Sequence, residues 1–168
     1  MSDQYRVQRM IACRILTLAG WIEGTMHLPQ GGTLLAFLGR GEPLFRLTET
    51  WLPGEHAPHP FFALQRDAVI AVSPISITEP LDATVGPPAI TRRISWLLGS
   101  GGVIEGTLEL AERMRVSDYL TTHSGFVPMR DCRVMLPPTA RGRFDETNVT
   151  LLALQSNRAI GVTEVDAS

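Results

Sequence analysis

The chain has no lysine, few aromatic residues and no long uninterrupted apolar run. Its 15 cationic side chains are therefore all arginines, against 17 acidic ones, and a net charge of −2 gives no general attraction to polyanions. Exclusive use of arginine fits either the codon bias of a GC-rich genome, which we favour, or a set of planar, bidentate anion contacts. The absence of a long apolar run predicts that the chain does not span a membrane.

Cysteine is also scarce. Cys13 and Cys132 lie far apart, and neither belongs to a pair with the spacing of a metal or redox motif. Two reduced thiols are therefore predicted, rather than a disulfide. Arg14 interrupts the only N-terminal stretch with the character of a signal peptide, and no small-residue cleavage pattern follows. We therefore expect a cytoplasmic protein.

Motifs of catalysis are missing as well. The sequence has no Ser–His–acid order, no dinucleotide fingerprint and no glycine-rich loop that opens a helix for a phosphate. His56 and His59 stand in a proline-rich loop, with His27 as the only further histidine nearby, which favours no metal site. Glu23 and Glu105 are carboxylates on alternating segments, where nothing predicts the burial that acid–base work needs. We therefore predict no enzyme activity, no cofactor and no metal. An enzyme whose site lies between two modules of the chain is kept as a third hypothesis, after the two binding functions described below.

One segment occurs twice. Residues 22–28 read IEGTMHL and residues 104–110 read IEGTLEL, and the same order of apolar positions follows at an offset of 82. After an eight-residue insertion the offset becomes 90, and FALQR at 62–66 meets LALQS at 152–156. A change of loop length between matched blocks is what a surface connection tolerates. The sequence therefore predicts one small module present in tandem.

Each module is predicted to be built of strands. Residues 21–28 and 103–110 alternate apolar and polar side chains, as half-buried strands do, and a glycine falls on the inward face in both. Such a glycine indicates a sharp bend or the close approach of another backbone. Leu34, Phe37 and Leu38, and then Val116, Tyr119 and Leu120, are spaced for one or two helical turns between the second and third strands.

The predicted fold class is mainly β, with two tandem copies of a five-stranded small β-barrel that each carry a short helix between strands two and three. The last two strands of each copy are predicted to form a hairpin across Asp67 or Asn157. The predicted boundaries are the first module at 8–75, a proline-rich linker at 76–90 and the second module at 91–165.

A five-stranded module with a glycine in its second strand resembles the Sm-like, SH3-type small barrel. The residues that carry this resemblance are Gly24 with Leu64, Gln65, Arg66, Asp67, Ile70 and Val72, and Gly106 with Leu154, Gln155, Ser156, Asn157, Ile160 and Val162. Sm-like proteins hold RNA through an Asp/Asn loop and an Arg–Gly pair, and this chain has neither, so those roles are not carried over. The segment from Arg115 to Leu120 also resembles uncharacterised bacterial domains of this build, which implies no activity.

The leading hypothesis is a non-enzymatic binding or assembly protein that acts through strand edges and loops, with a protein partner or self-association. An Sm-like RNA-binding protein is the second hypothesis. The residues expected to contact a partner are one exposed aromatic and several charged side chains: Trp51, Arg113, Arg115, Asp118, Arg141 and Arg143. Each also has an ordinary structural explanation, as a helix cap, a solvated charge or a packed aromatic.

Overall fold

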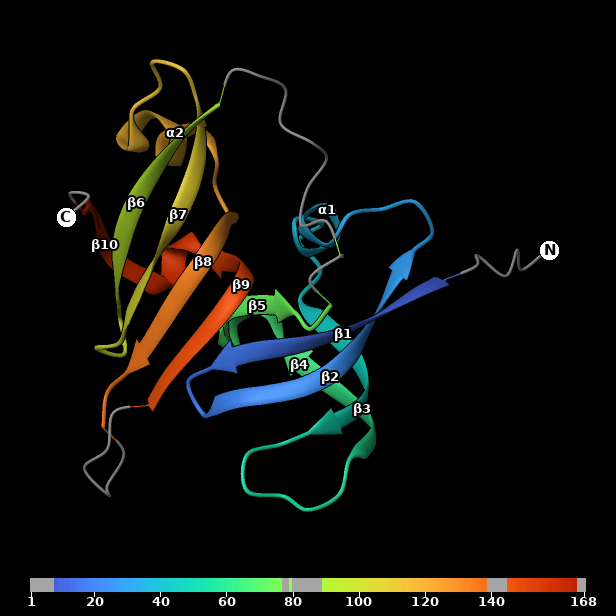
Figure 1. The fold of residues 1–168 in the computed structure, drawn as a ribbon. Helices are drawn as coiled ribbons and strands as arrows, with labels where there is room; N and C mark the ends of the chain where they lie inside the picture. The colour runs from blue at the N-terminus through green and yellow to red at the C-terminus, as the bar shows by residue number, and fades with distance from the viewer. Residues whose placement is uncertain (1–7, 77–78, 80–88, 139–144, 166–168) are drawn as a thin grey trace. The chain divides into compact units, whose positions relative to one another are not determined.

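A computed structural model of the chain is mainly β, and its described residues are 8–76, 79, 89–138 and 145–165. The chain divides into two compact units, residues 1–83 and 84–168, coloured blue to green and yellow-green to red in Figure 1. The division falls inside the range predicted as a linker, most of which lies outside the described residues. Among the described residues, no helix is long and apolar enough to cross a membrane.

Unit 1 contains five antiparallel strands in the order β5-β1-β2-β3-β4. A short helix, α1, follows the second strand, and a single 3-10 turn, η1, follows the fourth. The elements are β1 (Gln8–Thr17), β2 (Gly20–Pro29), α1 (Leu34–Leu38), β3 (Leu44–Trp51), β4 (His59–Gln65), η1 (Arg66–Ala68) and β5 (Val69–Pro74).

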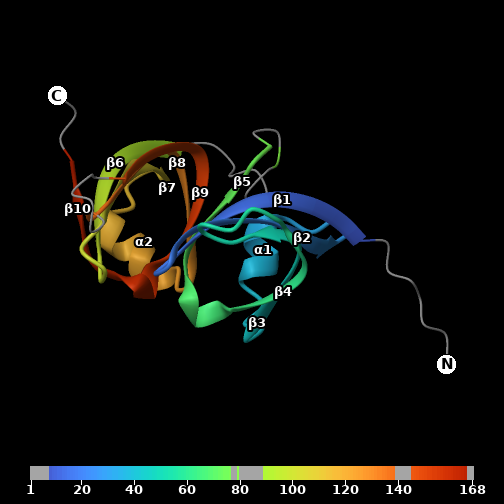
Figure 2. The ribbon, with the colours of Figure 1, turned by 90° about the horizontal axis from the view of Figure 1, so that it is seen from below.

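Unit 2 has the same order of elements, and its strands lie in the order β10-β6-β7-β8-β9. Seen from below, the strands of each unit curl into an arc with the short helix on its concave side (Figure 2). The elements are β6 (Ala89–Leu98), β7 (Val103–Ala111), α2 (Val116–Thr122), β8 (Phe126–Leu136), β9 (Asp145–Gln155), η2 (Ser156–Arg158) and β10 (Ala159–Glu164).

The helices confirm the short helical turns predicted between the second and third strands. In unit 1, Thr33 caps α1 because its hydroxyl accepts a hydrogen bond from the Ala36 amide. Leu34 and Leu38 are fully buried against the strands. The predicted alternation is also confirmed, since Ile22, Gly24, Met26 and Leu28 of β2 and their counterparts in β7 all face the core.

The predicted closing hairpins are wrong. β4 pairs with β3 and β5 pairs with β1, while the residues between β4 and β5 form η1 instead of a tight turn. Arg66 stabilises this change of direction, because its amide donates to the Pro43 carbonyl and its guanidinium to the Leu38 carbonyl. Two apolar runs separated by turn residues are compatible both with a hairpin and with two strands that pair with different neighbours. In unit 1 the outer strands β4 and β5 do not pair with each other, and in unit 2 the same is true of β9 and β10. Backbone pairing among the described residues therefore does not close either unit into a barrel.

A bulge explains the inward glycine of each unit. The pairing of β2 with β3 shifts by one residue between Glu23 and Thr25, and that of β7 with β8 shifts between Glu105 and Thr107. The extra residue in each third strand is acidic and has a left-handed backbone conformation: Glu49 has φ 48° and Asp131 has φ 49°.

The bulge directs the next side chain of the third strand into the core. In unit 2, a Cβ on Gly106 would lie 2.7 Å from Cys132 Sγ and 2.8 Å from Met129 Cε. In unit 1, a Cβ on Gly24 would lie 3.0 Å from Thr50 Oγ1. Each glycine therefore leaves room for a buried side chain that comes from the bulge.

Candidate functional site

Strand β4 is an outer strand of unit 1. It pairs with β3, and as far as the described residues go no other strand of this unit pairs with its second edge. Its sequence, HPFFALQ, contains no acidic residue and no arginine, and Pro60 within it is typical of an edge strand. Phe61 is 60% exposed. An edge strand that is largely apolar is a surface to which another strand can pair.

Trp51 and Phe61 lie on the same outer face of the unit 1 sheet. Trp51, at the end of β3, is in register with Glu23, and its side chain is 43% exposed. Phe61 is in register with Thr48, whose hydroxyl bonds to His27 Nε2 at 2.8 Å on the outer face. Trp51 is thus an exposed aromatic, as a partner contact requires. The sequence analysis missed Phe61, because the pair Phe61-Phe62 has the character of a buried strand.

A cavity of about 580 Å³ lies on the inward side of β4. Its walls come from the β1–β2 turn, the start of β2, the β3–β4 loop, β4 and η1. The lining residues are Thr17, Leu18, Ala19, Ile22, Leu52, Pro53, Glu55, Phe62, Leu64 and Ala68. The cavity is open to solvent along one side. The cavity and the unpaired edge therefore meet at the same strand.

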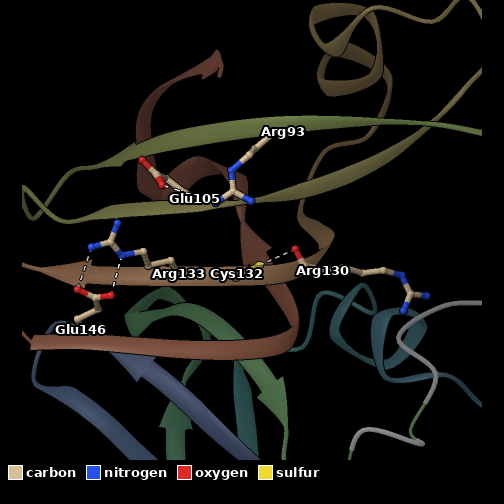
Figure 3. A network of polar contacts seen from close by, with 6 residues as sticks. All are labelled: Arg93, Glu105, Arg130, Cys132, Arg133 and Glu146. Carbon is tan, nitrogen blue, oxygen red and sulfur yellow. Dashed lines mark hydrogen bonds and ion pairs between the residues drawn. The ribbon is translucent and has the colours of Figure 1, made fainter. Parts of the chain in front are cut away.

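The outer face of unit 2 is charged where that of unit 1 is aromatic. Glu105 is in register with Arg133, in the same way as Glu23 is with Trp51. Arg133 binds Glu146 through two hydrogen bonds of 2.7 and 3.0 Å, and Arg93 lies 3.8 Å from Glu105 (Figure 3). The hydrogen bonds between Arg133 and Glu146 raise the pKa of Arg133 and lower the pKa of Glu146. These solvated ion pairs contribute little to stability, and they occupy the part of the outer face that corresponds to Trp51.

The predicted Arg113 and Arg115 lie just before α2 and Asp118 lies in its first turn, and all three are exposed. Arg113 has a φ of 71° in a turn closed by the Met114 amide and the Ala111 carbonyl, at 3.0 Å. The matching turn of unit 1, between Pro29 and Gly32, has Gly31 at φ 81°. Arg115 begins α2 without a side-chain cap, whereas Thr33 caps α1. Both arginines thus occupy positions where backbone geometry favours another residue type.

Arg141 and Arg143 lie outside the described residues. Among the described parts of the chain, no group of three or more His, Cys, Asp or Glu side chains is placed to hold a metal ion. His59 contacts Glu55, and His123 stacks on Tyr119 at 4.0 Å between ring centroids. His59 and His123 therefore have structural contacts of their own.

Comparison of the chain with family models, with curated proteins and with solved structures gives no match.

Proposed function

We propose that the chain is a non-enzymatic binding or assembly protein and that it binds a protein partner through the outer edge of β4. The observation that carries this proposal is an outer strand that combines an apolar sequence, an exposed Phe61 and a neighbouring exposed Trp51. Outer strands of native sheets usually carry charges or a covering segment, because an uncovered edge pairs with other chains. Within β4 itself, the one protective feature of this kind is Pro60, and no described strand of unit 1 covers its outer edge.

We further propose that the two units are tandem modules of the small-barrel type. Support comes from the shared bulge, which places an acidic left-handed residue and an inward glycine at the same offset of 82 in both units. The outer faces differ, since Trp51 in one unit corresponds to Arg133 in the other. Duplication followed by divergence of the outer faces would leave unit 1 as the binding module and unit 2 with a solvated surface.

Photo-crosslinking in cells tests the β4 surface. With Phe61 replaced by p-benzoylphenylalanine, we expect irradiation to trap a protein, or a second copy of this chain, in a covalent adduct that mass spectrometry identifies. The same replacement at Leu97 is the control, because Leu97 is 45% exposed but lies on β6, which is paired on both sides. No adduct at residue 61, or equal adducts at 61 and 97, would contradict the proposal.

An Sm-like RNA-binding function is the second candidate, and the conformation of Arg113 favours it. A non-glycine residue held at positive φ costs about 1–2 kcal/mol and tends to persist where function requires it. Arg113 and Arg115 are both exposed and both replace residues that suit the backbone better in unit 1. Two such arginines on one loop provide cationic groups for a phosphate backbone.

The double variant Arg113→Gly/Arg115→Thr, which copies unit 1, is expected to raise the free energy of unfolding by about 1–2 kcal/mol, because it removes the strained φ and supplies a cap. Urea unfolding measures this gain. If the arginines serve RNA, the variant also loses its low-salt mobility shift with single-stranded RNA. Arg46→Gln/Arg92→Gln removes two exposed charges elsewhere and is the control. If the unmodified protein gives no mobility shift with single-stranded RNA at low salt, the RNA-binding function is excluded.

A further inference from the structure

The cavity of unit 1 lies at the opening between β4 and the β1–β2 turn. On one side it is bounded by Phe62 and Leu64, the inward-facing side chains of β4. On the other side it is bounded by the turn at Leu18 and Ala19, and Leu18 is 74% exposed. Backbone pairing does not join β4 to β5, so the sheet of this unit is not continued across that opening.

A strand that paired with the outer edge of β4 would become the next strand of the unit 1 sheet. Side chains on the same face of neighbouring strands lie about 4.5–5.5 Å apart at Cβ, so its inward residues would stand beside Phe62 and Leu64. These two residues line the cavity. Alternate side chains of the added strand would point the other way, beside Phe61 and Ala63, into solvent.

The chemistry of the lining specifies the segment. Eight of the ten lining residues are apolar. Of the two polar ones, Thr17 is already used within its turn, because its hydroxyl donates to the Gly20 carbonyl and accepts from the Ala19 amide. Glu55 is the single charged lining residue, and its one described side-chain partner is His59 of β4. The cavity therefore suits apolar side chains, and a basic residue of the segment would replace His59 as the partner of Glu55.

We propose that an extended partner segment, apolar at alternate positions and carrying a basic residue, adds as a strand to β4 and fills this cavity with its inward side chains. This inference rests on the proposed function, because it specifies the partner for the same strand edge. Main-chain hydrogen bonds to β4 would give affinity, and the cavity would select the inward side chains.

The test uses the full chain and a synthetic peptide of eight residues in which valine alternates with threonine and arginine stands at one end. We expect the peptide to bind and to slow amide hydrogen exchange in β4. Ala68→Leu, which narrows the cavity, should weaken binding by about tenfold or more. Its control is Ala36→Leu, the same change at an exposed position of α1 that lines neither the cavity nor the β4 edge, which should leave the affinity within about twofold. Thermal unfolding establishes that both variants are folded.

The outcomes separate this inference from the proposed function. A peptide of the same composition with its valines contiguous should bind weakly, and equal binding of both peptides would overturn the inference. It would also be overturned if Ala68→Leu bound the alternating peptide as well as the unmodified protein does, or if that peptide did not bind at all. A trapped adduct at residue 61 would still support the edge in each of these cases. Glu55→Gln should weaken binding of the peptide that carries arginine, but not binding of the analogue in which glutamine replaces arginine. Equal effects on both peptides would show that the partner needs no basic residue.

Discussion

Gly106→Ala is expected to lower the free energy of unfolding by about 2–3 kcal/mol, at the upper end of the cost of overpacking a core. The new Cβ would lie 2.7 Å from Cys132 Sγ, 2.8 Å from Met129 Cε and 3.2 Å from the Arg130 carbonyl oxygen. Met129 is flexible and able to move, but the carbonyl belongs to a paired strand and Cys132 is fixed by the bulge. Urea unfolding followed by circular dichroism measures the change.

Two other glycines provide the controls for this prediction. Gly161→Ala lies on β10, where a Cβ meets nothing within 4 Å, and should change stability by less than about 0.5 kcal/mol. Gly24→Ala meets Thr50 Oγ1 at 3.0 Å and should have an intermediate cost. Adding Cys132→Ala to Gly106→Ala should recover part of the loss, because the two sites are in contact. A strictly additive double variant would show that Cys132 is not the source of the strain.

The same glycines show which parts of the fold can be predicted from sequence. Gly24 and Gly106 interrupt an alternating pattern on its inward face, so both the strand and the close approach of another chain segment could be predicted. The bulge that causes the approach could not, because it depends on the left-handed Glu49 and Asp131, which are not residue types that this conformation demands. The hairpin prediction failed for a similar reason, since three residues between apolar runs suit either a turn or η1.

The candidate site was harder to predict than the fold. Trp51 could be named because tryptophan side chains are often interface anchors, but Phe61 could not be told from a core residue. The cavity is assembled from Leu18, Pro53, Phe62 and other residues that are far apart in sequence, and no local pattern reports their meeting. The repeat did contain one usable signal. Aligning Arg113 with Gly31 and Arg115 with Thr33 exposes substitutions that oppose local backbone preference.

The contrast between the two outer faces favours unit 1 as the binding unit. Arg133 and Glu146 satisfy each other on unit 2, so a partner would have to break their hydrogen bonds before gaining new ones. Trp51 and Phe61 offer apolar area that a partner would remove from water, at about 25 cal/mol per Å². The physical difference between the faces is therefore a difference in the cost of desolvation.

The two thiols are expected to react with Ellman's reagent at pH 8 about a thousandfold more slowly in the folded protein than in urea. Burial raises the pKa of Cys13 from its ordinary value of 9.0 to about 12, and the negative charge of Glu79 adds to the effect. Burial also raises the pKa of Cys132 to about 12, with a further rise from Asp131 and an opposing effect of Arg93. Because the thiolate is the reacting form, a shift of about three units accounts for the slower rate before access is considered.

The same pKa shifts predict how stability depends on pH. Both folded-state values lie above the unfolded ones, so their contribution to stability is fully present below pH 9 and is lost as pH rises toward 12. The chain has no lysine and only two tyrosines, so few other groups titrate in this range. The urea midpoint should therefore fall steadily above pH 9, and Cys13→Ala/Cys132→Ala should flatten this dependence. An equally steep fall in the double variant would show that the thiols are not its cause.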